Sequence, residues 1–362
     1  MNRVFWIDLI RVVGALFVIA IHVSGRAAGG YETSGETLTW LFSRCYHELS
    51  HVAVPLFIMI SGALLLERND EPLPFYRKRF GKILMPFFAW CCIYLFCRYI
   101  TGQRLQDETL ITWLSSVGAI LSRNISGHFW FMYLLISLYL AAPFLAVFVR
   151  NASKNTLFVF FALWLFAVVF YPVVNNVAKE TWGIEKIDFR FEFISYWVGF
   201  FIAGYILKGY TISKRQIAIA VILWFFLSLA NPVNAYLQAV SSEHTVVSIC
   251  SFLGTYVFSI TSHQSVVSLL AFLVLRSLGE ISSFAASRFG QMISFIAPLT
   301  FGVYLSHMLF VLPVMRVAAL ESDTSWLVIL CGIPILTILI YAASGGMIYL
   351  IRKVRYLKFL AP

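Results

Sequence analysis

Long apolar stretches recur along the whole chain, and most of them cover about 16 to 22 residues. A stretch of this length is long enough, as an α-helix, to cross the hydrocarbon core of a bilayer, which takes about 20 residues. Membrane β-strands would instead give segments of about ten residues with alternating hydrophobicity, and we find no such pattern. With 60% hydrophobic and 12% charged residues, the chain cannot hide its apolar surface as a soluble globule. The sequence therefore predicts an all-α polytopic membrane protein.

We predict about ten transmembrane helices. They cover approximately residues 5–23, 51–66, 83–100, 129–149, 157–174, 193–207, 217–237, 265–275, 292–315 and 326–351. The segment 246–260 is also apolar, but counting it as a span would move the basic residues after it to the other side of the membrane. We interpret it as a re-entrant or interfacial segment. Together with 265–275 it could instead form a broken helix pair that lines a cavity.

The basic residues predict the orientation of these helices. With the N-terminus in the cytoplasm, most of the 27 Lys and Arg residues fall in cytoplasmic segments, in agreement with the positive-inside rule. Both termini are then cytoplasmic, and residues 1–362 form a single membrane domain without a separate soluble domain. The net charge of +10 is spread over short loops, which favours anionic lipid headgroups and a phosphorylated cosubstrate as partners rather than nucleic acid.

The first predicted span carries two ionisable residues, Arg11 and His22. Eleven residues of α-helix come within roughly 20° of three whole turns and rise about 16 Å, so the two side chains share one stripe near opposite ends of the span. Asp8 lies close to the same stripe. An ionisable group inside a bilayer costs about 3 kcal/mol unless it faces a partner or a cavity, so such residues indicate a functional site. The alternatives are a structural Asp8–Arg11 ion pair and an interfacial histidine bonded to a loop carbonyl.

Five motifs, in order along the chain, resemble those of the acyltransferase family 3 integral-membrane acyltransferases. They are Arg11-x10-His22, Pro55-Leu-Phe-x-x-x-Ser61-Gly62, the basic stretch from Phe75 through Arg79 to Pro86, His128-Phe-Trp130-Phe, and Phe301-Gly-Val-Tyr304-Leu-Ser-His307. The resemblance extends from Trp6 to about Phe310. One departure is Gly14, where the family often has Ala, and it predicts a close helix neighbour.

The resemblance implies a membrane O-acyltransferase, because many members of the family O-acetylate bacterial surface polysaccharides. We expect a multi-pass protein of the bacterial inner membrane that moves acetyl from cytoplasmic acetyl-coenzyme A to a hydroxyl of a surface polysaccharide or a lipid-linked sugar at the periplasmic face. Acetyl-coenzyme A would serve as the acyl donor rather than as a permanently bound cofactor. No HExxH motif or Cys/His cluster predicts a metal site.

The expected roles of the site residues follow from their chemistry. The Arg11 guanidinium can pair with the phosphates of coenzyme A, and Arg79 and Lys78 are candidates for further phosphate contacts. The pantetheine arm could then run along the stripe past Gly14, Ala15 and Val18. At the far end His22 would act as general base on the acceptor hydroxyl. Direct transfer requires fewer assumptions than an acyl-histidine intermediate.

Other polar residues have both structural and functional interpretations. Glu48 is the candidate for orienting the His22 imidazole, with Glu32 or Glu36 as alternatives. The basic cluster before the third span could be only a topology signal; it consists of Arg77, Lys78, Arg79 and Lys82. Ser61 and Gly62 could be a helix-packing pair. His128 and Trp130 could belong to an aromatic belt rather than to the acceptor site. His307 is expected to be a structural hydrogen-bond partner, with a second base as the alternative.

A rival function comes from a different class. The intramembrane charges would also suit a permease or exporter of polysaccharide or small molecules without acyl transfer. A lipid-scaffolding subunit without its own activity is a third possibility. The identity of the acceptor, the acyl group and the oligomeric state are left open by the sequence.

Overall fold

The computed structural model describes residues 4–27, 37–101, 125–184, 196–241, 243–256, 260–318 and 324–361. Within these ranges the chain is almost entirely helical and contains no strand. The helices are α1 (Phe5–Ala27), α2 (Leu38–Ser50), α3 (Ala53–Leu65), α4 (Pro72–Ile100), α6 (Trp130–Asn151), α7 (Lys154–Leu165), α8 (Tyr171–Trp182), α9 (Tyr196–Leu207), α10 (Lys214–Val240), α11 (His244–Tyr256), α12 (Ile260–Leu278), α13 (Ser282–Ala286), α14 (Arg288–Ile296), α15 (Thr300–Ser306), α16 (Met308–Ala318) and α17 (Trp326–Lys353). Short 3-10 or π turns connect or extend them at Gly127–Phe129, Phe166–Phe170, Ala297–Leu299 and Arg355–Leu360.

Eight helical segments among the described residues are long and apolar enough to cross a membrane. They are Phe5–Ala27, Leu38–Leu65, Pro72–Ile100, Gly127–Asn151, Lys154–Lys179, Lys214–Val240, Arg288–Ser306 and Trp326–Lys353. Shorter apolar helices cover Tyr196–Leu207, His263–Leu278 and Met308–Ala318. The structure therefore confirms an all-α polytopic membrane protein, while the count of ten spans and the cytoplasmic termini stay predictions.

Several boundaries differ from the predicted ones for physical reasons. The predicted span 51–66 is the second part of a longer helical unit that begins at Leu38. The prediction left out the first part because α2 contains many polar residues. The predicted span 292–315 is interrupted between α14 and α15 by a 3-10 turn that contains Pro298, and again at His307, where α15 ends and α16 begins. The apolar segment 246–260 lies mostly in α11, which packs against α10.

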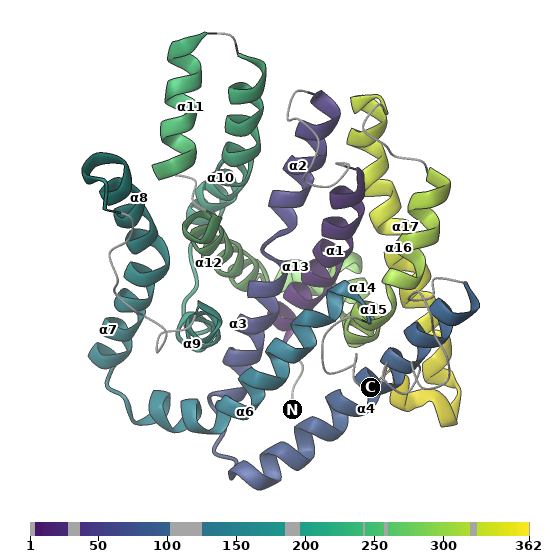
Figure 1. Cartoon of the computed structure of the whole chain (residues 1–362). Coiled ribbons are helices and arrows are strands. Elements are labelled where there is room, and N and C mark those ends of the chain that lie inside the picture. The colour runs from purple at the N-terminus through teal and green to yellow at the C-terminus, as the bar shows by residue number, and fades with distance from the viewer. Residues whose placement is uncertain are drawn as a thin grey trace, which may run out of the picture.

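Helix α1 lies at the centre of the molecule (Figure 1). It packs against α2, α3, α12 and α17, and against the helices on both sides of His307. Its apolar residues are buried on more than one face, with Ile10, Ile19 and Val23 fully inaccessible. An amphipathic surface helix would bury only one stripe. The position of α1 therefore places Asp8, Arg11 and His22 beside other helices of the bundle, with Asp8 the buried one of these three.

Helices α3 and α9 cross in close contact because glycines face each other's backbone. A Cβ at Gly62 would lie 1.7 Å from the carbonyl oxygen of Phe201, and one at Gly204 would lie 1.9 Å from the carbonyl oxygen of Met59. Small residues that allow such an approach are typical of membrane helix interfaces. The structural interpretation of Gly62 as a packing residue is confirmed, and α3 also packs against α1.

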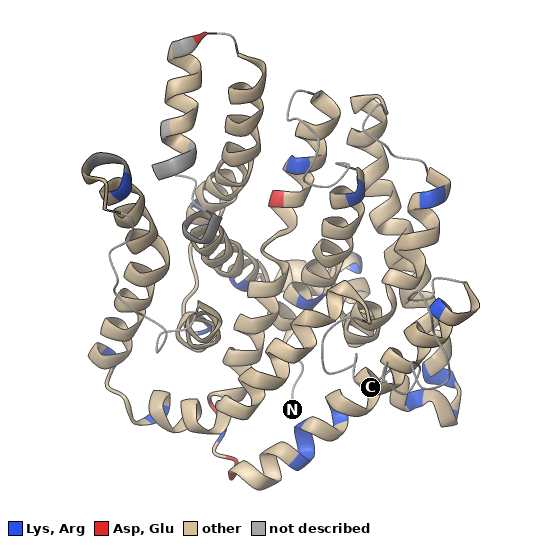
Figure 2. Cartoon of the chain, viewed as in Figure 1, with Lys and Arg blue, Asp and Glu red and all other residues tan. Residues whose placement is uncertain are grey.

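The two ends of the chain lie toward the same end of the bundle, near α4 (Figure 1). Lys and Arg residues of α4 and of the C-terminal region gather at this lower end in the view (Figure 2). This arrangement agrees with the predicted placement of both termini on one side of the membrane.

Candidate active site

Three histidines from distant parts of the sequence meet beside α1. His22 projects from α1, His128 lies in the 3-10 turn before α6, and His307 stands at the junction of α15 and α16. The centroids of the His22 and His307 rings are 5.3 Å apart, those of His128 and His307 are 4.9 Å apart, and those of His22 and His128 are 6.4 Å apart. His22 is half-buried, whereas His128 and His307 are buried. His22 is thus the member of this imidazole cluster that an entering group meets first.

Hydrogen bonds hold the two buried rings in place. The Nδ1 of His307 donates to the carbonyl oxygen of Tyr304 at 2.7 Å, and the Nδ1 of His128 lies 2.7 Å from the Oγ of Ser126. The hydroxyl of Tyr304 donates to the carbonyl oxygen of His128 at 2.6 Å, which ties the two segments together. The Nε2 atoms of both histidines are buried and have no hydrogen-bond partner among the described residues.

The segment around His307 is fixed by its own backbone. The His307 amide donates to the carbonyl of Val303 at 2.9 Å and closes α15, while its carbonyl accepts from the amides of Phe310 and Val311 and opens α16. The hydroxyl of Tyr94 on α4 donates to the carbonyl of Leu305 at 3.0 Å. The break in the helix therefore presents the His307 side chain at a defined position.

Glu48, which was expected to orient His22, instead contacts residues of its own helix and the residue that follows it. Its carboxylate accepts a hydrogen bond from Arg44 at 2.8 Å and lies 3.6 Å from the Nδ1 of His51. In the part of the chain that the structure describes, no contact joins Glu48 to His22. The alternatives Glu32 and Glu36 lie outside the described residues. The role of an acidic residue in orienting His22 stays a prediction.

A residue that the sequence analysis did not single out, His47, lies closer to the His22 region. Its Nδ1 is 3.3 Å from the carbonyl oxygen of Ile21 and 3.4 Å from the Oγ of Ser24. Its ring stacks edge-on against His51 at 4.4 Å. A signal was present in the sequence, since Arg44, His47, Glu48 and His51 have the spacing of one helix face.

The other end of the α1 stripe carries a cationic site. Arg11 is 40% exposed and its guanidinium lies 4.0 Å from the buried carboxylate of Asp8. The phenol of Tyr139 on α6 lies beside Ser61 and within electrostatic reach of both Arg11 and Arg79. Residues of α1, α3, α4 and α6 therefore converge around Tyr139.

The basic stretch of α4 separates into inward and outward residues. Arg77 and Lys78 are exposed, whereas Arg79 is half-buried with its guanidinium 6.0 Å from the centre of the Phe75 ring. The Nε of Arg79 is buried, and no acceptor is found for it among the described residues. Of these basic residues, Arg79 is thus the one that the fold turns toward the Arg11 end.

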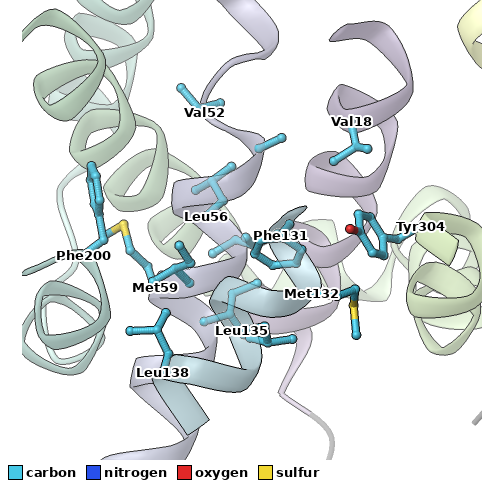
Figure 3. Close-up of a cluster of buried hydrophobic side chains, with 14 of the residues drawn as sticks. Val18, Val52, Leu56, Met59, Phe131, Met132, Leu135, Leu138, Phe200 and Tyr304 are labelled. Carbon is cyan, nitrogen blue, oxygen red and sulfur yellow. The ribbon is translucent and has the colours of Figure 1, made fainter. Parts of the chain in front are cut away.

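Aromatic and aliphatic side chains lie between the two ends of the stripe. A Cβ at Gly14 would lie 3.1 Å from the Phe57 ring of α3, which confirms the close neighbour predicted for this position. The Phe57 and Phe131 rings are 6.1 Å apart, and Val18 belongs to the same buried cluster (Figure 3). The predicted course of the pantetheine arm along this stripe stays a prediction, and it would require the Phe57 ring to move.

Trp130 marks a more accessible surface next to the imidazole cluster. It is 37% exposed, and its ring lies 5.8 Å from that of Trp197 on α9. Among the described residues, no group of three or more His, Cys, Asp or Glu side chains is arranged to hold a metal ion. The site therefore consists of a cationic end, an apolar middle and an imidazole end.

The family of the chain can now be stated. Residues 4–345 match the acyltransferase domain family. No match was found among curated proteins or among solved structures. Because the match covers nearly the whole chain, the protein belongs to this family, and it is a multi-pass membrane acyltransferase.

Proposed function

We propose that the protein moves acetyl from cytoplasmic acetyl-coenzyme A to a hydroxyl of a surface polysaccharide or lipid-linked sugar at the periplasmic face of the bacterial inner membrane. One observation carries this proposal. A cationic site and an imidazole cluster lie along the same face of the central helix α1, about 16 Å apart by helix rise. A transfer reaction whose donor and acceptor come from opposite sides of a membrane needs donor binding and proton transfer to be separated in this way.

The donor would bind at the cationic end. Guanidinium groups form bidentate, charge-assisted hydrogen bonds with phosphate, and coenzyme A carries several phosphate charges. The buried Nε of Arg79 has no acceptor among the described residues, and a phosphate oxygen would supply one. Arg11 would add a second cation, since it too lies within electrostatic reach of Tyr139. Exposed Lys78 would contribute long-range attraction rather than a fixed contact.

The chemistry would take place at the imidazole end. The acceptor hydroxyl oxygen attacks the thioester carbonyl carbon while its proton passes to His22. The bond between carbon and sulfur then breaks, and the departing thiolate takes that proton from the imidazolium, so the products are an ester and free coenzyme A. General base catalysis of this kind contributes about 10² to 10⁴ in rate.

The acceptor would lie beside the His128 and Trp130 segment. Trp130 offers an exposed aromatic face, and aromatic rings of this kind present an apolar body with a polar edge suited to sugar rings. His128 belongs to the imidazole cluster, and its buried Nε2 would bind a hydroxyl of the acceptor. The pair would thus place a sugar hydroxyl within reach of His22.

The experiment measures transfer of radiolabelled acetyl from acetyl-coenzyme A into the glycan fraction of inverted membrane vesicles. Vesicles that contain the protein should incorporate label, while vesicles without it, or with the His22→Ala variant, should not. If His22→Ala leaves incorporation intact while the glycan is no longer exported, the protein is an exporter and the proposal is wrong. Right-side-out vesicles, which hide a cytoplasmic donor site from added acetyl-coenzyme A, should incorporate label only after permeabilisation.

A further inference from the structure

Among the described residues, no carboxylate contacts His22, although a carboxylate often fixes the tautomer of a catalytic imidazole. Glu48 is held by Arg44 and His51. Within the described part of the chain, the charged side chain that acts on His22 is Arg26, one turn further along α1, and a cation cannot accept a hydrogen bond from the ring. A neutral acceptor can also determine which nitrogen of His22 carries the hydrogen.

The structure supplies such an acceptor in His307. A neutral imidazole has one N–H donor and one bare nitrogen. The Nδ1 of His307 lies 2.7 Å from the carbonyl oxygen of Tyr304, which can only accept, so Nδ1 carries the hydrogen. The Nε2 is consequently the bare nitrogen. It is buried and has no partner among the described residues, so its lone pair is available within the imidazole cluster.

The distance between the rings distinguishes His307 from its neighbour. Two imidazoles joined by an N–H···N bond of about 2.9 Å have centroids about 5 Å apart. The His22 and His307 centroids are 5.3 Å apart with a tilt of 34°, so a small shift of the half-buried His22 ring would form this bond. His128 is 6.4 Å away and nearly perpendicular, which is too far for the same contact.

We propose that His307 is a positioning residue for the acyl transfer, because its bare Nε2 accepts a hydrogen bond from one nitrogen of His22 and leaves the other nitrogen of His22 free to act as the base. This inference rests on the proposed function. The same bond stabilises the imidazolium that forms when His22 takes the proton of the acceptor hydroxyl. An imidazole thus performs the orienting role that the sequence analysis assigned to a carboxylate.

Two substitutions separate this role from a structural one. The side-chain amide of His307→Asn lies where Nδ1 was and keeps the bond to the Tyr304 carbonyl, but it does not reach the Nε2 position. The amide of His307→Gln reaches the Nε2 position and offers its oxygen to His22, but it gives up the bond to Tyr304. We expect His307→Asn to melt near the wild-type temperature and to lose about 10²-fold in kcat, with the KM for acetyl-coenzyme A unchanged. His307→Gln should melt lower and retain most of its kcat.

The assay is the incorporation of label from radiolabelled acetyl-coenzyme A into the glycan fraction of the same inverted vesicles, with thermal unfolding of each purified variant in detergent. Activity of His307→Asn equal to that of the wild type overturns the inference, and so does a loss in both variants that follows their melting temperatures. Failure of the proposed function is a different result, because the wild-type protein would then show no incorporation at all.

Discussion

The two ends of α1 differ in how far their functional side chains are exposed. At one end Arg11 is 40% exposed and lies 4.0 Å from Asp8, at the limit of an ion pair. At the other end His128 and His307 are buried, and hydrogen bonds of 2.7 Å fix their rings behind the half-buried His22. A partly exposed cation can meet a hydrated phosphate group, whereas a proton transfer requires a ring that is held in one orientation. The proposed function accordingly assigns binding to one end and chemistry to the other.

The most direct test of this difference is to remove the functional side chain at each end of α1 separately. His22→Ala should lower kcat by about 10²- to 10⁴-fold with little change in the KM for acetyl-coenzyme A, because a base acts in the transition state. Arg11→Ala should mainly raise KM. Steady-state kinetics in vesicles measure both constants. If Arg11→Ala lowers kcat as much as His22→Ala does, the two ends do not divide binding from chemistry.

The framework between the two ends is tested by the contact of α3 with α9. Gly62→Ala would place a Cβ 1.7 Å from the Phe201 carbonyl oxygen, so the helices must separate, at a cost of about 1–3 kcal/mol or more. Gly81→Ala on α4 is the matched control, because nothing lies within 4 Å of its Cβ position and Ala is favoured in a helix by about 1 kcal/mol. Thermal unfolding in detergent should show a lower melting temperature only for Gly62→Ala.

Substitutions of two neighbouring basic residues test whether the cationic end binds phosphate through a specific contact. Arg79→Gln should raise the KM for acetyl-coenzyme A about tenfold, the loss of roughly 1.4 kcal/mol that one charge-assisted hydrogen bond contributes. Lys78→Gln removes the same charge from an exposed position and should change KM much less. Equal effects of the two variants would mean that the basic stretch acts only as a diffuse charge.

The smallest expected effect is the response to salt. Raising the ionic strength from 0.15 M to 1 M shortens the Debye length from about 8 Å to about 3 Å, so the KM for acetyl-coenzyme A should rise a few-fold because Arg11 is partly exposed. The kcat should stay nearly constant, since the imidazole cluster is largely buried. A salt effect on kcat alone would reverse the assignment of the two ends.

Some of the site could be predicted because it depends on one helix alone. The spacing of Arg11 and His22 places both on one face of α1 by helix geometry, whatever surrounds that helix. The departure from the family's Ala at Gly14 predicted a close helix neighbour, and the Phe57 ring confirms it. The family could also be predicted, because its motifs are short segments that can be found in order along the sequence without knowledge of the fold.

Other features could not be predicted, because they depend on how helices cross. The pattern of α4 marks Lys78 and Arg79 as equivalent cations, yet only Arg79 turns inward. Glu48 was chosen for its place at the mouth of a predicted span, but its carboxylate is held by residues on its own helix face, three and four positions away. The role of α2 was hidden because its polar face lowers its hydropathy.

The sequence by itself determined that this protein is a helical membrane protein with a cation and an imidazole on one stripe of its first helix, because apolar length and helical periodicity are local properties. Its ordered motifs, rather than these properties, indicated the acyltransferase family. Only the tertiary structure decided that His22, His128 and His307 meet and that the buried Nε2 of His307 has no hydrogen-bond partner among the described residues. The contacts between these histidines come from segments far apart in the chain, and packing around α1 brings them together.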